Sequence, residues 1–223
     1  MFMQFYLEEG YMEREAAENI IENNLYGIDI DKRAYQLAYF SLMMKGRQHN
    51  RRIFNKNIKN NLYYYIDSNE IDRKQIDCLG GNVEDKDVWG EQRNDISEIV
   101  ELFKDGRELG SIIKIDKKYN YDELIQFIKN IDRNVLPMEL IDIDNTQANL
   151  IHIIKLTKVL SSKYEIVVTN PPYLGRRHMG SNSTRYLDKE YKDTKSDLFA
   201  VFIEFGLNIT KKHGFMGMVT MQS

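Results

Sequence analysis

The sequence is poor in the residues and runs that define several protein classes. Its single cysteine, Cys78, excludes an internal disulfide and indicates a reducing compartment, so we expect a cytoplasmic protein. No run of about 18 apolar residues occurs, which argues against a membrane span. The first residues carry acids where a secretory signal needs positive charge. The four histidines are scattered and form no cluster with metal-ligand spacing, so we expect chemistry without a metal.

A net positive charge and Gly-x-Gly motifs are lacking as well. The chain has 223 residues and a formal charge of −3, so it shows no overall electrostatic signature of nucleic-acid binding. Any contact with DNA must then come from a local patch or from a further domain. The length is sufficient for one sizeable hydrophobic core.

The N-terminal part of the sequence has an α/β pattern. Residues 1–22 predict an amphipathic helix that is interrupted near Gly10. The short apolar run 25–30 predicts a buried parallel strand, and the apolar positions between residues 32 and 45 predict a helix that packs on a sheet. Gly46 follows this helix and is expected to be its C-cap.

The C-terminal part returns to the same pattern. Cations and then Gly214 follow an apolar helical stripe, as they do at helix C-termini. In chain order, we expect a helix over 145–161, a strand over 165–169, a polar and basic loop over 175–196, a helix over 197–211 and a strand over 215–221.

The middle of the sequence is less regular. Polar stretches alternate with short helical patterns over residues 47–145. We interpret this region as an insertion of mixed, mainly helical character between two parts of one core, residues 1–46 and 146–223. Within it, Tyr63-Tyr64-Tyr65 is either a surface on which bases stack or the end of a buried strand, and the second interpretation is favoured.

The most informative stretch is Asn170-Pro171-Pro172-Tyr173, which follows the strand-like run 164–169. Each proline fixes a φ angle and lacks an N–H, so the pair fixes the direction of its carbonyls. The Asn170 side chain and the Pro171 carbonyl are then two fixed acceptors, and Tyr173 is a flat face beside them. This arrangement suits a planar substrate with an exocyclic amino group. The alternative is a turn that ends the strand and has no chemistry.

A second candidate site is Gly27-Ile28-Asp29-Ile30-Asp31. An acidic residue at the carboxyl end of a buried parallel strand can accept both hydroxyls of a ribose. We therefore predict that Asp29 is a ribose acceptor and that Ile30 contacts the adenine ring of a cofactor. Asp31 is expected to cap the next helix. Turn residues without a ligand are the alternative.

Three motifs, in this order, resemble those of large adenine-specific DNA methyltransferases. The resemblance is strongest to the PglX type of BREX phage-defence systems and to its restriction–modification relatives. It is good over residues 5–47 and 164–223 and vague between them. The motifs are Tyr26-Gly-Ile-Asp-Ile-Asp-Lys-Arg-Ala-Tyr-Gln-Leu-Ala38, Asn170-Pro-Pro-Tyr173 and Lys195-Ser-Asp-Leu-Phe-Ala-Val-Phe-Ile-Glu204.

The resemblance implies a Rossmann-like methyltransferase fold, S-adenosylmethionine (SAM) as the methyl donor and adenine in double-stranded DNA as the substrate. It implies that Asp29 binds the ribose of SAM. Asn170 and the Pro171 carbonyl then accept the hydrogens of the adenine N6 amino group. Tyr173 is implied to stack on a flipped base. Phe202 either lines the pocket for the adenine of the cofactor or belongs to the core.

The basic loop after the Asn-Pro-Pro-Tyr motif has two interpretations. Its cations can meet phosphates near a flipped base. Asp188, Glu190 and Asp193 dilute the positive charge, so a solvated surface loop is the alternative. The cations are Arg176, Arg177, His178, Arg185, Lys189, Lys192 and Lys195.

The sequence also departs from the family pattern. The Gly-rich loop that precedes the Asp29-type strand in the family is absent, and no segment is left for a target-recognition domain. The acidic residue that often contacts the cofactor base from a middle strand is not identifiable, with Asp72, Asp77 and Asp85 as candidates. We therefore expect an internal piece of a larger methyltransferase, from a split or decayed gene, that needs a companion polypeptide or the missing segments for activity.

The leading hypothesis is a fragment of a DNA adenine-N6 methyltransferase in phage defence or restriction–modification. A protein glutamine-N5 methyltransferase also uses an Asn-Pro-Pro-Tyr turn, because it methylates a planar amide nitrogen. The long gap between Asp29 and Asn170 favours the DNA enzyme. A non-catalytic remnant or assembly module of the same fold is the alternative without turnover.

Overall fold

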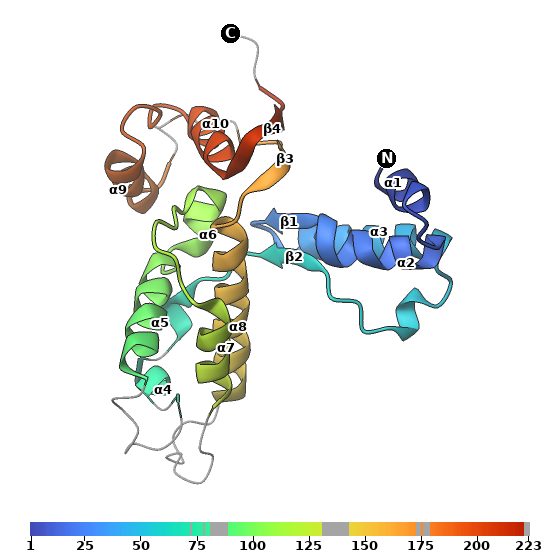
Figure 1. The fold of residues 1–223 in the computed structure, drawn as a ribbon. Helices are drawn as coiled ribbons and strands as arrows, with labels where there is room; N and C mark the ends of the chain where they lie inside the picture. The colour runs from blue at the N-terminus through green and yellow to red at the C-terminus, as the bar shows by residue number, and fades with distance from the viewer. Residues whose placement is uncertain are drawn as a thin grey trace. The chain divides into compact units, whose positions relative to one another are not determined.

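A computed structural model describes most of the chain (Figure 1). The described residues are 1–71, 73–77, 79–80, 89–130, 143–172, 175 and 179–220. Several residues named above lie outside them, namely Asp72, Cys78, Asp85, Tyr173, Arg176, Arg177 and His178, and the side chain of Asp77 is likewise outside. The chain divides into two compact units, Met1–Tyr65 and Ile66–Ser223.

The first unit is built on two parallel strands joined by a long helix. Strand β1 (Tyr26–Asp29) pairs with β2 (Asn61–Tyr64), so that Asp29 lies opposite Tyr64. Between the strands in sequence, α3 (Lys32–His49) packs on both of them. The remaining elements are α1 (Phe2–Glu8), α2 (Glu13–Asn19), a π-helical turn (Ile20–Asn24) and a 3₁₀ turn (Ile53–Asn55).

Two glycines of this unit have different roles. Gly10 has φ +89°, a conformation that favours glycine, and it separates α1 from α2 as the sequence predicted. The prediction that Gly46 caps α3 is wrong, because the helix continues past it and Asn50 is the capping residue. A Cβ at Gly46 would lie 2.6 Å from Ile53 Cδ1 and 2.8 Å from Ile21 Cδ1. Glycine therefore lets the core of this unit close around α3.

The strand predictions in this unit are confirmed. β1 lies within the predicted run 25–30. The favoured interpretation of Tyr63–Tyr65 is also confirmed, since Tyr63 and Tyr64 belong to β2 and Tyr65 is 1% exposed. The described part of residues 47–145 thus contributes one strand, which pairs with β1, besides the helices described next.

The second unit contains a layer of helices. α5 (Gly90–Leu102), α7 (Tyr121–Lys129) and α8 (Ile143–Leu160) pack against one another (Figure 1). Phe103 and Phe127 are buried in this layer. α8 confirms the helix predicted over 145–161. The shorter elements are a 3₁₀ turn (Ser68–Glu70), α4 (Arg73–Asp77), α6 (Gly106–Leu109) and a second 3₁₀ turn (Gly110–Ile112).

A second pair of parallel strands follows this layer in the chain. β3 (Tyr164–Thr169) confirms the predicted strand and pairs with β4 (Thr210–Met218), with Thr169 opposite Met218. α9 (Ser181–Glu190) and α10 (Leu198–Ile209) lie between them in sequence. α10 packs on both strands. The unit therefore repeats the arrangement of two parallel strands with a helix against them.

The prediction of an unbroken loop over 175–196 is wrong, because α9 forms within it. The helix is anchored by contacts that the polar sequence pattern does not reveal. Leu187 is buried, and the backbone N–H and the hydroxyl of Ser183 both donate to Glu108 Oε1, at 3.1 and 2.9 Å. Tertiary contacts with α6 thus stabilise a short helix in a strongly polar segment.

The boundary between the last helix and strand also differs from the prediction. α10 ends at Ile209, and the cations and Gly214 belong to β4. The register jumps from Tyr164 opposite Thr210 to Ile166 opposite Phe215, so β4 carries extra residues at this point. His213 has φ +68°, within this irregular stretch. The Lys-Lys-His-Gly signal therefore marks a bend in a strand, not a helix C-terminus.

At the level of fold class, the α/β prediction is confirmed. Helices lie between consecutive strands of the described chain, and both strand pairs are parallel. Among the described residues, no helix is both long and apolar enough to cross a membrane.

Candidate active site

The carboxyl end of β1 presents the predicted ribose acceptor. Asp29 is the last residue of the strand, and its side chain is exposed. Asp29 Oδ1 accepts a hydrogen bond from the Asp31 backbone N–H at 2.8 Å. In the described part of the chain, Oδ2 accepts none, so this oxygen can accept from a ligand. Asp31 Oδ1 accepts from the Arg33 N–H at 2.8 Å, which confirms Asp31 as the cap of α3.

Aromatic side chains surround this strand end. Tyr64 lies opposite Asp29, and its ring centroid is 5.1 Å from that of Tyr35 on α3. Lys32 Nζ lies 5.3 Å from the centroid of Tyr64. Burial, and then the neighbouring tyrosines, raise the pKa of Tyr63 and of Tyr35. Both phenols therefore stay neutral.

Ile30, the predicted contact for the cofactor base, follows Asp29 directly. Its side chain is 44% exposed, an unusual position for isoleucine. Gly27 lies earlier in the strand, and a Cβ there would meet Leu62 Cδ2 at 2.7 Å. Glycine therefore lets β2 approach β1 closely. The exposed Ile30 beside an exposed carboxylate provides an apolar and a polar contact at one strand end.

The predicted catalytic turn lies at the carboxyl end of β3. The side chain of Asn170 is exposed, Pro171 is buried and Pro172 is exposed. Among the residues that the structure describes, no hydrogen bond engages the Asn170 amide. Tyr173, the predicted stacking residue, lies outside the described residues. A free asparagine amide on a turn anchored by a buried proline is suited to binding a ligand.

Neighbouring backbone contacts fix this turn. The Val219 N–H donates to the Thr169 carbonyl at 3.4 Å, so the chain after β4 holds the end of β3. Gly175 forms an antiparallel bridge with Asp197. Asp197 in turn caps α10, since its Oδ1 accepts from the Phe199 N–H at 3.3 Å. Gly175, which follows the predicted catalytic turn, is thereby tied to the start of α10.

Phe202, the third predicted cofactor contact, lies on α10. Its side chain is 8% exposed, and it is buried together with Val201 and Phe205. Phe202 therefore contributes to the core of the second unit. Its contact with a cofactor stays a prediction.

The predicted basic loop is partly neutralised. Lys189 Nζ lies 2.9 Å from Glu190 Oε1, and Lys195 Nζ lies 3.1 Å from Asp188 Oδ1. Arg185 and Lys192 are exposed. Two of the three acids that dilute the charge in sequence, Asp188 and Glu190, thus also pair with these lysines in space.

A lysine that the sequence analysis does not single out, Lys114, organises the segment after the predicted catalytic turn. Lys114 Nζ donates to Glu204 Oε1 at 2.9 Å and to the Glu190 carbonyl at 2.5 Å, and lies 3.9 Å from the centroid of the Tyr191 ring. Thr194 Oγ1 donates to Glu204 Oε2 at 2.7 Å. Burial by itself raises the pKa of Glu204, but the hydrogen bonds from Thr194 and Lys114, together with the lysine charge, outweigh it and lower that pKa.

Tyrosines extend this network. The Lys114 backbone N–H donates to the Tyr186 hydroxyl at 2.8 Å, and burial raises the pKa of Tyr186 to about 12. The Tyr191 hydroxyl donates to the Ile112 carbonyl at 2.7 Å. Residues 112–114 thus hold α9, the loop after it and α10 together. Of these residues only Glu204 lies in a recognisable motif, so no sequence pattern points to its partner Lys114.

A comparison with known protein families decides the classification. The model of the Eco57I restriction-modification methylase family matches residues 23–223. The chain belongs to this family. The matched range includes β1, the Asn170 turn and the motif that ends at Glu204.

Two curated relatives support the same classification. The adenine-specific methyltransferase PglX of Lacticaseibacillus casei (strain Zhang) is 39% identical over 221 residues, which are 99% of this chain and 18% of the relative. The adenine-specific methyltransferase BrxX of Escherichia coli O9:H4 (strain HS) is 31% identical over 236 residues, 98% of this chain and 19% of the relative. The chain thus spans about a fifth of the length of these relatives. The resemblance to adenine-specific methyltransferases of the PglX type is confirmed.

Within the Eco57I methylase family match, the predicted site residues fall into both units. Asp29 and Ile30 belong to the unit Met1–Tyr65. Asn170, Pro171, Pro172 and Phe202 belong to the unit Ile66–Ser223. In each unit, a polar predicted site residue therefore lies at or directly after the end of a parallel strand: the Asp29 carboxylate in the first and the Asn170 amide in the second.

Proposed function

We propose that this chain carries the catalytic turn and part of the cofactor site of a DNA adenine-N6 methyltransferase that acts in phage defence or restriction–modification. The observation that carries the proposal is the exposed Asn170 amide, held by a Pro-Pro pair directly after the parallel strand β3. Membership of the Eco57I restriction-modification methylase family and two relatives named as adenine-specific methyltransferases support it.

SAM is the cofactor that we propose, and when bound it supplies an electrophilic methyl group. The first unit has side chains that fit it. The exposed Asp29 carboxylate, at the end of a parallel strand, suits the two ribose hydroxyls. Ile30 suits the face of the adenine ring, and Phe202 is proposed as a further contact of that ring.

The catalytic turn is proposed to act on an exocyclic amino group. A ring amino nitrogen donates its lone pair into the ring and is therefore a poor nucleophile. Asn170 Oδ1 and the Pro171 carbonyl accept the two hydrogens, which favours a pyramidal nitrogen with an available lone pair. Pro172 keeps the Pro171 carbonyl in one direction. The base must leave the duplex to reach such a turn, and Tyr173 is proposed to stack on it.

We infer a Rossmann-like methyltransferase fold, because each unit contains two parallel strands with a helix against them. A Gly-rich loop for the methionine part of SAM is proposed to come from a companion polypeptide or from another segment of the same protein, and likewise a target-recognition domain. Since the proposed substrate is DNA, we place the reaction in the cytoplasm.

The experiment that tests this function follows a labelled methyl group from SAM. The purified protein, together with any companion polypeptide that binds it, is incubated with DNA, which is then digested to nucleosides. Labelled N6-methyladenine is the expected product. Label on N4-methylcytosine would assign a different base, and label on protein glutamine would assign the other class of enzyme. No transfer in the complete assembly would leave a non-catalytic module.

A further inference from the structure

Charge is separated along the first unit. Residues 1–31 contain eight acidic residues and a single basic one, Arg14. Residues 32–65 contain eight lysines and arginines and no acidic residue. The whole chain has a net charge of −3, so this segment differs in sign from the rest. Such a separation places the positive charge on α3 and on the loop that follows it.

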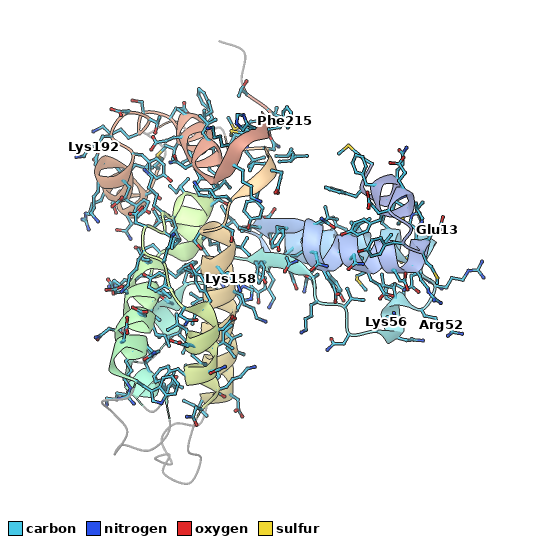
Figure 2. The ribbon with its side chains drawn as sticks, in the orientation of Figure 1. Glu13, Arg52, Lys56, Lys158, Lys192 and Phe215 are labelled. Atoms are coloured by element: carbon cyan, nitrogen blue, oxygen red, sulfur yellow. The ribbon has the colours of Figure 1, made fainter. Side chains whose placement is uncertain are left out.

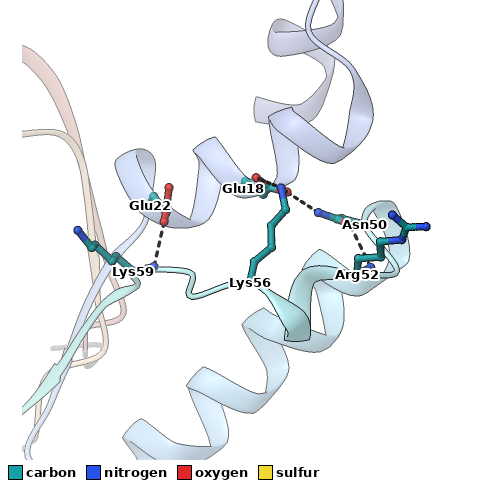
Figure 3. Close-up of polar contacts among 6 residues, drawn as sticks. All are labelled: Glu18, Glu22, Asn50, Arg52, Lys56 and Lys59. Atoms are coloured by element: carbon teal, nitrogen blue, oxygen red, sulfur yellow. Dashed lines mark hydrogen bonds and ion pairs between the residues drawn. The ribbon is translucent and has the colours of Figure 1, made fainter.

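The acidic helix α2 neutralises only part of this charge. Glu18 accepts from Lys56 Nζ and from the Asn50 amide, both at 2.5 Å (Figure 3). Glu13 Oε2 lies 3.9 Å from His49 Nδ1. Glu22 accepts from the Lys59 backbone N–H at 3.0 Å. These contacts hold the loop after α3 against α2 and the π-helical turn, and they use the carboxylates of Glu13, Glu18 and Glu22.

Four exposed cations at the far end of α3 and just after it have no carboxylate partner among the described residues: Lys45, Arg47, Arg51 and Arg52. Figure 3 shows the Arg52 guanidinium turned away from Glu18, and Figure 2 shows Arg52 at the end of the unit farthest from the strands. Arg47 lies 5.6 Å from the centroid of the exposed ring of Phe54, an arrangement that restrains the guanidinium. We call these four cations the basic tip.

The basic tip is separate from the proposed cofactor site. α3 begins just after Asp29 and contains 18 residues, so its far end lies about 25 Å away along the helix. Its C-terminal dipole accounts for some attraction of cations. However, Arg51 and Arg52 lie beyond the end of the helix, and acids are absent over all of residues 32–65. The helix dipole, which acts only near the last turn, does not explain a positive segment of this length.

We propose that the basic tip binds the phosphate backbone of duplex DNA about 25 Å from the cofactor contact at Asp29. Exposed, unpaired guanidiniums form bidentate hydrogen bonds with phosphate, and they bind without reading sequence. A duplex carries one charge per about 1.7 Å, so it offers several phosphates to a tip of this kind. The choice of DNA among polyanions rests on the proposed function.

The test is the salt dependence of DNA binding by the double variant Arg51→Gln/Arg52→Gln. Affinity for a labelled 30-base-pair duplex is measured by fluorescence anisotropy over a range of NaCl concentrations. Loss of two phosphate contacts lowers the slope of log K against log [NaCl] by about 1.8 and weakens binding by up to roughly 60-fold at 0.1 M salt. Arg51→Lys/Arg52→Lys keeps most of the slope, because the charge remains.

The control is Lys104→Gln/Lys158→Gln, which removes the same charge from two exposed, ion-paired lysines of the second unit. Its slope is expected to equal that of the unchanged protein. An unchanged slope in the arginine double variant, or an equal fall in the control, would overturn the proposal. So would competition by polyglutamate as effective as by DNA, because it would indicate an acidic protein partner. Methyl transfer to adenine is scored separately, so a failure of the proposed function leaves this result interpretable.

Discussion

The two units end a parallel strand in the same way but support that end differently. β1 ends at the exposed Asp29, whose hydrogen bonds come from neighbours in its own strand pair: Asp31 in the following turn and Tyr65 just after β2. β3 is followed directly by the exposed Asn170, and the surroundings of that residue are held by distant segments. Lys114 contacts α9 and α10 from more than 70 residues away. A local turn is sufficient to present a carboxylate for binding, whereas the proposed catalytic turn depends on a wider framework.

The largest expected effect concerns Asn170. Asn170→Ala removes a side-chain acceptor from the reacting nitrogen and leaves the Pro-Pro turn intact. Turnover is expected to fall about a hundredfold or more, as the loss of one preorganised polar group commonly does. SAM affinity is expected to stay unchanged. Steady-state methyl transfer and calorimetry measure the two quantities. Asn57→Ala, at an exposed asparagine of the first unit, is the control. Loss of SAM binding in Asn170→Ala would instead indicate that Asn170, like Asp29, contributes to binding the cofactor.

The next prediction concerns Asp29 and its neighbour Asp31. Asp29→Ala is expected to weaken SAM binding by about 1–3 kcal/mol, because the ribose hydroxyls lose their partner. Asp31→Ala removes the cap of α3 and is expected to cost about 1 kcal/mol of stability with little loss of affinity. Isothermal calorimetry and thermal denaturation separate the two effects. Equal SAM affinity in both variants would remove Asp29 from the cofactor site.

The comparison of the two strand ends also explains what the sequence predicted well. β1, α3 and the cap Asp31 follow from contiguous patterns, and so does β3 with its Asn-Pro-Pro turn. The errors occur where contacts between distant residues decide the structure. Gly46 fits a helix end by type but lies inside α3 because Ile21 and Ile53 need the space. α9 forms because Glu108 holds its first turn.

The same reasoning applies to the site. Asp29, Ile30 and Asn170 were predicted from short motifs, and the structure places each at or next to the end of a parallel strand. Lys114 was not predicted, because its partners Glu190 and Glu204 lie far along the chain and no motif includes it. Single residues in an irregular segment carry no periodic signal, whatever their role in three dimensions.

A smaller effect is expected at Lys114. This prediction tests whether contacts between distant residues support the second unit around its strand end. Its side chain is 21% exposed, and Lys114→Met removes hydrogen bonds to Glu204 and to the Glu190 carbonyl. We expect a loss of about 1–2 kcal/mol in the unfolding free energy of the second unit. Urea denaturation followed by the fluorescence of Trp89, which packs against Phe127 in that unit, reports it.

Lys104→Met is the matched control for this prediction. Lys104 pairs with Glu101 three residues away on the same helix end, and the side chains are 58% and 57% exposed. An exposed pair of this kind contributes about 0–1 kcal/mol. If both variants lost the same amount of unfolding free energy, Lys114 would be an ordinary surface lysine, and the framework around the proposed catalytic turn would not depend on it.

The smallest expected effect is the pH dependence of the same network. The hydrogen bonds from Thr194 and Lys114 lower the pKa of Glu204 below its ordinary value of 4.5 in the folded protein. Between these two pKa values the unfolded chain binds more protons, so the contribution is present above about pH 4.5 and is lost as pH falls through the folded pKa. We expect the stability difference between the unchanged protein and Glu204→Gln to shrink by less than about 1 kcal/mol from pH 6 to pH 3. Glu101→Gln, which removes an exposed partner of Lys104, is expected to differ little from the unchanged protein at either pH. If the stability difference between the unchanged protein and Glu204→Gln grew on acidification, burial and not the pairing with Lys114 would dominate the pKa of this carboxylate. The structure around the strand end of the second unit would then not depend on that ion pair.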